Sequence, residues 1–217
     1  MRNLPPSQRA TVRRRPGRAE YGLAAIYRIL DEGLVAHVGF ATPEGPVVIP
    51  ATYARDGDRL YLHGGTASRM FGALASGAEC CVTITLLDGL VLARSGFHHS
   101  MNYRSVVVFG RAAPVLDRKE KERAFTRFVE HVVPGRGAEV RPPTAAELDA
   151  TLLVSLPLEE SSAKVRSGPP VDDEDDYALP IWCGVVPLAS RAAEPIPDER
   201  NLPGVALPAY LQPYRRP

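Results

Sequence analysis

The chain has 217 residues, of which 45% are hydrophobic and 24% charged, and its formal net charge at pH 7 is +1. A chain of this size can bury the core of one globular domain, and its near-neutral charge excludes a general attraction to nucleic acid or anionic lipid. Its three cysteines form neither a zinc-ribbon nor a disulfide pattern, and no apolar run is long enough to span a membrane, so we expect a cytoplasmic protein.

Residues 1–19 are rich in arginine and proline and are predicted to form an extended arm. The arginines of this arm are Arg2, Arg9, Arg13, Arg14, Arg15 and Arg18. No aromatic residue lies between them to stack on bases. We therefore expect the arm to lie across its own domain or a partner subunit rather than on nucleic acid.

A helix and three strands follow the arm. Glu20–Glu32 has apolar residues at helical spacing, and Gly33 is the natural stop. The strands are predicted over 34–41, 47–54 and 59–63, joined by the turns TPEGP and RDGD. Pro50 lies inside the second strand, where it cannot donate to a ladder. It marks an edge, a bulge or a place where backbone carbonyls face a ligand.

The stretch Arg59–Met70, RLYLHGGTASRM, is predicted to be a strand, a glycine turn and the start of a helix. Thr66 or Ser68 can cap that helix, which is expected over 67–76. This arrangement favours a phosphate-binding site. The helix start offers free N–H groups, Thr66 and Ser68 offer hydroxyls, and Arg69 offers a guanidinium with several donors. The alternative is an ordinary connection with a solvent-facing arginine.

The second half of the chain contains further strands and two helices. Strands are predicted over 80–87, 106–115, 151–158 and 179–188, with extended segments over 90–94 and from 161, and helices over 117–133 and 144–150. Asp88-Gly89 is expected to form a turn and 97–105 an irregular segment. Residues 171–177 read as an acidic loop, and 189–217 as a Pro-rich tail. This order predicts a mainly β, antiparallel barrel with flanking helices.

Three histidines are candidates for chemistry. His63 ends the strand before the glycine turn, and is predicted to donate a hydrogen bond or act as an acid–base group beside a ligand, or else to be structural. His98 and His99 are adjacent, so on a strand they would point to opposite faces, and we expect no metal site. Trp182, the only tryptophan, could be core filler or an aromatic wall beside a flat ligand.

Five stretches together resemble the pyridoxamine 5'-phosphate oxidase-like FMN-binding split-barrel family, and most of all its nitroimidazole-resistance-type branch. These stretches are LYLHGGTASRM, CVTITLLDGLVLARS, FHHSMNYRSVVVFGRA, SAKVRSGPP and LPIWCGVVPL. With the leading helix they span residues 21–188. The resemblance implies a homodimer of six-stranded antiparallel split barrels, with FMN bound at the subunit interface. The domain would cover 20–188, between the arm and the tail.

The resemblance also implies a set of cofactor-binding residues. Ser68 and Arg69 would hold the flavin phosphate, and His63 would lie near the ring as a catalytic residue. The other implied positions are Ile49, Pro50, Ala51, Thr52, Leu62, Thr66, Arg104, Ser105, Lys164 and Trp182, with Arg166 as a further positive charge.

The chain departs from the oxidase itself at two places. Met70 stands where the oxidase has a lysine after the phosphate-binding arginine, and the tail lacks the oxidase's arginine-containing substrate segment. We therefore expect an FMN-dependent oxidoreductase that reduces a small organic acceptor, for which a nitroaromatic is one candidate. The alternatives are a non-catalytic flavin or haem protein, with His98 or His99 as the haem ligand, and a deazaflavin-dependent reductase.

Overall fold

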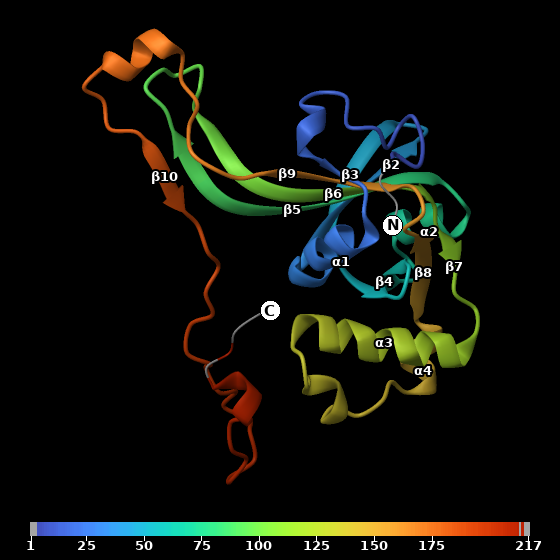
Figure 1. Ribbon diagram of the computed structural model, residues 1–217. Helices are drawn as coiled ribbons and strands as arrows, with labels where there is room; N and C mark the ends of the chain where they lie inside the picture. Colours follow the sequence, from blue (N-terminus) through green and yellow to red (C-terminus); the bar gives the residue numbers. More distant parts are fainter. Residues whose placement is uncertain (1–3, 213, 215–217) are drawn as a thin grey trace.

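The computed structural model describes residues 4–212 and residue 214 (Figure 1). Arg2 and the rest of the first three residues of the predicted arm, and four residues of the predicted tail, lie outside this part. The strands are β1 (Ala19–Glu20), β2 (Val35–Thr42), β3 (Gly45–Asp56), β4 (Arg59–Gly65), β5 (Glu79–Leu92), β6 (Ser100–Arg111), β7 (Ala113–Pro114), β8 (Thr151–Pro157), β9 (Ser161–Arg166) and β10 (Gly184–Pro187). The α-helices are α1 (Leu23–Glu32), α2 (Arg69–Ala75), α3 (Arg118–Val132) and α4 (Ala145–Asp149).

All strand pairs are antiparallel in the described part, and the order is β1-β9-β6-β5-β2-β3-β4-β8-β7, with β10 added beside β5. The sheet curls around a core in which alternate residues point inward, as the pleat requires. Val38 faces Val82 and Ile84 faces Val106 across neighbouring strands, and all four are buried. The predicted mainly β split barrel is confirmed. The sheet is not closed, because β1 and β7 each pair on one side only.

The longest hairpin of the sheet, β5 with β6, differs from the sequence prediction. Asp88-Gly89 is not a turn: β5 continues to Leu92, and a bulge between Leu87 and Gly89 takes up the extra residue. Pairing with β6 therefore extends through most of the segment predicted as irregular, as far as Ser100 opposite Val91. The hairpin projects from the barrel, and the strand β10 lies along it (Figure 1). Only Gly184–Pro187 of the predicted last strand is extended and paired.

The arginine-rich arm lies on its own domain. Arg9 forms ion pairs with Glu79, at 3.1 Å, and with Glu160. The backbone N–H of Val12 donates to the hydroxyl of Tyr21 at 3.0 Å, and β1 then pairs with β9. The described part of the arm is thus held on its own domain at Arg9 and at β1.

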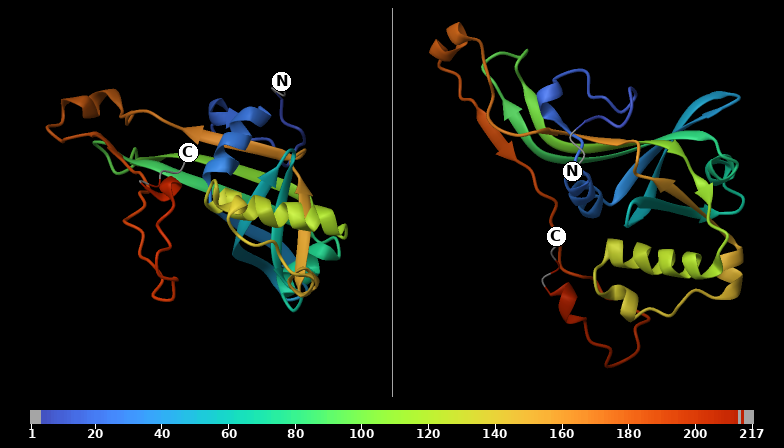
Figure 2. Two further views of the ribbon diagram at one scale, coloured as in Figure 1. Left: turned by 90° about the horizontal axis from the view of Figure 1, so that it is seen from below. Right: turned by 45° about the vertical axis from the view of Figure 1, so that its right-hand side comes forward.

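Helix α3 crosses below the barrel near β4 (Figures 1 and 2). Asp117 caps it by accepting a hydrogen bond from the backbone N–H of Glu120 at 2.8 Å. The tail returns to the far end of this helix, where the hydroxyl of Tyr210 donates to Glu139 at 2.6 Å. Among the described residues, no helix has the length and apolar character needed to cross a lipid bilayer.

Candidate functional site

The predicted order of strand, connection and helix is present, but the glycines do not form the turn. Gly64 and Gly65 are the last residues of β4 and pair with β8, and the turn lies at Thr66 and Ala67. Ser68 is the N-cap of α2, and its Oγ accepts from the backbone N–H of Phe71 at 3.5 Å. Gly64 is required here, because a Cβ on it would overlap the buried ring of Phe71. Arg69 is exposed and has no carboxylate within 4.0 Å in the described part of the chain. Its guanidinium is therefore available to an anion beside Thr66 and Ser68.

His63 lies at the mouth of an apolar pocket of about 410 Å³ that the sequence analysis did not predict. Its ring packs against Phe128, with 4.2 Å between ring centroids, and against Phe125 at 5.6 Å. The remaining lining residues are Thr52, Val129, Val132, Val133 and Arg136. Helix α3 thus supplies most of the wall. Part of its apolar face lines a cavity because α3 packs over β3 and against His63 of β4.

The imidazole of His63 is poised to accept a partner. Its Nδ1 is buried and has no hydrogen-bond partner among the described residues. Burial lowers the pKa of His63 below the usual range of histidine, because the apolar surroundings disfavour the charged ring. The neutral ring keeps one nitrogen lone pair, which can accept a hydrogen bond or bind a metal ion.

The predicted flavin-lining segment Ile49–Thr52 lies on the exposed part of β3. Residues before Tyr53 pair with β2 only, since the pairing of β3 with β4 begins at Tyr53. Pro50 lies opposite His37 in this edge segment. Since one side of the strand has no neighbouring strand here, a residue without an N–H is tolerated, and the edge interpretation accounts for the proline. Thr52 lines the pocket beside His63, whereas Ile49 and Ala51 are half-buried against the core.

Five other predicted positions do not line this pocket. The side chain of Leu62 is fully buried in the core. Arg104 is occupied by two carboxylates, Glu32 and Asp88. Lys164 lies in a different, cationic pocket, and Trp182 is 69% exposed and packs against Gly184. Ser105 donates from Oγ to the backbone carbonyl of Lys164 at 3.4 Å. The local segments were placed correctly, but their side chains face different sides of the sheet.

The described residues contain no group of three histidine, cysteine, aspartate or glutamate side chains that could hold a metal ion. His98 and His99 lie near the tip of the β5–β6 hairpin. His98 Nε2 lies 3.2 Å from a carboxylate oxygen of Asp173, and His99 Nδ1 lies 2.9 Å from the backbone carbonyl of Ser95.

Residues 23–165 match the family model of pyridoxamine 5'-phosphate oxidase. The chain belongs to this family. The resemblance inferred from the sequence is thereby confirmed, and the match covers both β3 and the β4–α2 connection.

Solved structures extend the comparison beyond the family model. The flavocytochrome Anf3 from Azotobacter vinelandii is 43% identical, with a TM-score of 0.91, and the alignment covers 97% of this chain and 98% of that one. The FAD and haem binding protein from Mycobacterium smegmatis is 34% identical, with a TM-score of 0.86, covering 90% of this chain and 96% of that one. A protein from Bacteroides thetaiotaomicron, described as a 5-nitroimidazole antibiotic resistance protein, shares the fold at 22% identity, with a TM-score of 0.57 and coverage of 68% and 86%. None of the curated proteins matched this chain.

Proposed function

We propose that this protein is a flavin-dependent oxidoreductase that binds FMN, or the FMN portion of FAD, along β3 and at the β4–α2 connection. The observation that carries the proposal is Arg69, which has no carboxylate within 4.0 Å among the described residues. It lies beside the Ser68 cap, just after the end of β4, where Gly64 leaves no room for a side chain. Relatives that align over nearly the whole chain are described as a flavocytochrome and as an FAD and haem binding protein. Their descriptions support a flavin as the ligand.

The residues present fit a flavin phosphate and ring. Arg69 supplies the charge that offsets a phosphate dianion, and the hydroxyls of Thr66 and Ser68 supply donors. The exposed edge of β3 offers backbone groups to a flat ring. Bound flavin supplies two-electron chemistry, and the neutral His63 would orient a small organic acceptor, such as a nitroaromatic, by hydrogen bonding.

A second copy of the chain would complete this site. Val35 and Val48 lie on the outer face of β2 and β3 and are 47% and 65% exposed. On the projecting hairpin, Leu87 and Met101 are 44% and 50% exposed. Apolar surface of this extent favours burial against another protein. We propose a homodimer in which the partner covers this face and encloses the flavin.

The phosphate contact is tested by Arg69→Ala. Loss of a charge-assisted hydrogen bond of about 1.5–3 kcal/mol should weaken flavin binding roughly ten- to a hundredfold. The measurement is a fluorescence titration with FMN and with FAD after removal of bound flavin. Arg28→Ala, which removes an exposed arginine of α1, is the control and should leave the affinity unchanged. Equal affinity of Arg69→Ala and the parent protein would exclude Arg69 from the site.

A second candidate function, haem binding, is favoured by the pocket at His63. The pocket is apolar, its only titratable lining groups are His63 and Arg136, and the imidazole nitrogen has no partner in the described part of the chain. A neutral imidazole is the form that ligates iron, and Arg136 could pair with a haem carboxylate. His98 and His99, the ligands expected from the sequence, lie instead near the end of the hairpin, and neither lines this pocket.

Absorption spectra test this second function. We expect a Soret band from the purified or haem-reconstituted protein, and His63→Ala should abolish or shift it. The matched variant His98→Ala/His99→Ala should keep the band of the parent protein. A band that survives His63→Ala and disappears in the double variant would move the haem ligand to the hairpin, and a parent protein that takes up no haem would exclude the function.

A further inference from the structure

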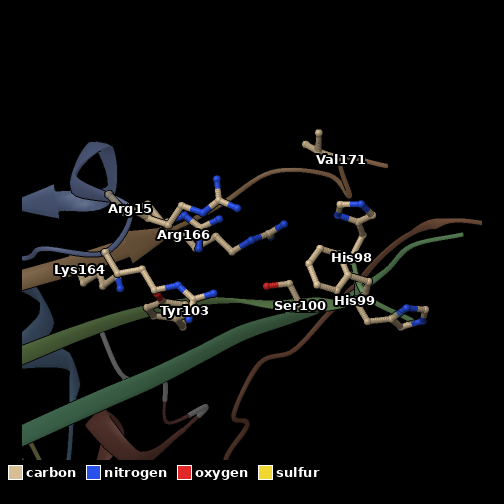
Figure 3. Close-up of a pocket in the computed structure, with 11 residues that line it drawn as sticks. Arg15, His98, His99, Ser100, Tyr103, Lys164, Arg166 and Val171 are labelled. Carbon is tan, nitrogen blue, oxygen red and sulfur yellow. The ribbon is translucent and has the colours of Figure 1, made fainter. Parts of the chain in front are cut away.

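A second pocket, separate from His63 and Arg69, is strongly cationic. It has a volume of about 600 Å³ and lies between the arm, β9 and the end of the β5–β6 hairpin (Figure 3). Its lining residues are Arg14, Arg15, Arg18, Phe97, His98, His99, Ser100, Tyr103, Lys164, Arg166 and Val171. Five of them carry a fixed positive charge, and none is acidic.

The five cations are not neutralised by the protein. None of them has a carboxylate within 4.0 Å in the part of the chain that the structure describes. The nearby Asp172 is held by Arg94, whose Nη1 donates to it at 3.0 Å. Asp173, which is highly exposed, lies next to His98. Such a cluster of like charges destabilises the fold unless an anion joins it.

Arg166 shows most clearly that the pocket is built for a ligand. It is only 8% exposed, and its Nη atoms donate to Asn102 and to the backbone carbonyls of Gly168 and Pro169. Its Nε is buried without a partner among the described residues. Burial, together with the charge of Arg18, lowers the pKa of Arg166. A buried guanidinium with an unused donor is costly unless an anion completes it.

The cations approach from two elements. The arm contributes Arg14, Arg15 and Arg18, and β9 contributes Lys164 and Arg166. Figure 3 shows Arg15, Lys164 and Arg166 on one side of the pocket, with His98 and His99 on the other. The arm is fixed in this place by the ion pairs of Arg9 and by β1. Two sets of cations in a pocket of this size suit a ligand with two linked anionic groups rather than a single small anion.

We propose that this pocket binds a diphosphate group. Two sources share that chemistry. One is a free nucleotide, which leaves the flavin phosphate at Arg69 as proposed above. The other is the diphosphate of FAD, which includes the flavin phosphate and would therefore place that phosphate in this pocket instead of at Arg69. The inference about the pocket itself does not depend on which of the two is bound. The source of the diphosphate rests in part on the proposed function, so the experiment has separate arms.

The test measures binding of inorganic pyrophosphate by calorimetry, together with the shift in Tm that it causes. The flavin-loaded parent protein, exchanged into FMN, should bind pyrophosphate saturably and gain thermal stability. The variant Arg15→Gln/Lys164→Gln should bind it at least tenfold more weakly. Arg28→Gln, which removes one exposed cation outside the pocket, should behave as the parent. Arg166→Lys is a second variant, used if the double variant folds poorly. It keeps the positive charge but loses the guanidinium and its several N–H donors, so it should also bind pyrophosphate more weakly than the parent.

The FAD-loaded protein distinguishes the sources. If the diphosphate of FAD occupies the pocket, that form should not bind pyrophosphate, the double variant should lose affinity for FAD, and Arg69→Ala should keep it. If a free nucleotide is the ligand, both flavin forms should bind pyrophosphate. Absence of saturable binding to the FMN form, or equal binding by the parent and the double variant, overturns the proposal. If the protein binds no flavin, pyrophosphate binding is measured on the protein as purified. Failure of the proposed flavin function and failure of the diphosphate proposal are then two separate results.

Discussion

Replacing Gly64 with alanine should lower the free energy of unfolding by about 1–3 kcal/mol, the usual cost of overpacking a core. The added methyl group would overlap the ring of Phe71, which is 5% exposed and cannot move aside into solvent. The ring and the start of α2 must shift together. Ser68, whose Oγ caps that helix through the N–H of Phe71, and Arg69 would shift with it. We therefore expect weaker flavin binding as well as lower stability.

Gly65→Ala is the matched control for this prediction. A Cβ on Gly65 meets no atom within 4 Å, so its change in stability should stay within about 0.5 kcal/mol. Urea unfolding of both variants, followed by flavin titration, gives the two effects separately. Equal stability of the Gly64→Ala and Gly65→Ala variants would show that Phe71 yields easily, and that the end of β4 is not fixed by this contact.

Local sequence patterns were sufficient for the elements that carry the candidate flavin site. The strand-forming runs over 34–41, 47–54 and 59–63 predicted β2, β3 and β4, and the hydroxyl of Ser68 predicted the start of α2. The predicted break at Gly64 and Gly65 is wrong, because both residues continue β4. Local capping chemistry also marks the starts of the helices predicted over 117–133 and 144–150, where Asp117 caps α3 and a Thr144–Glu147 capping box begins α4. These features depend on residues within a few positions of one another, so a single sequence displays them.

The features that the sequence did not display depend on contacts between distant segments. The apolar pocket at His63 exists because α3 packs on β4, and an apolar helix face does not specify what it covers. The cationic pocket needs the arm to lie against β9, which is some 150 residues further along the chain. The continuation of β5 through Asp88 likewise depends on its partner β6, because pairing across a bulge overrides the local preference of Asp-Gly for a turn.

The most instructive difference concerns Arg104, which the resemblance placed at the cofactor. Its guanidinium donates to both carboxylate oxygens of Asp88, at 2.7 and 2.9 Å, and to both of Glu32. It therefore links the end of α1 and the bulge of β5 to β6. The three side chains are each about one-third exposed, at 31–35%, so solvent screens part of their attraction. Arg104 thus has a structural role in the described part of the chain, and its contact with a cofactor stays a prediction.

Arg104→Ala should therefore reduce stability without weakening flavin binding. We expect a loss of about 1–2 kcal/mol, because two carboxylates lose their shared cation and repel each other. Adding Glu32→Gln to this variant should restore part of the loss, since one of the two charges is then removed. Arg118→Ala, whose exposed pair with Glu122 is 3.7 Å long, is the control and should be near neutral. The measurements are urea unfolding and flavin titration of all the variants. Weaker flavin binding by Arg104→Ala at unchanged stability would contradict the structural role and support a contact between Arg104 and the cofactor.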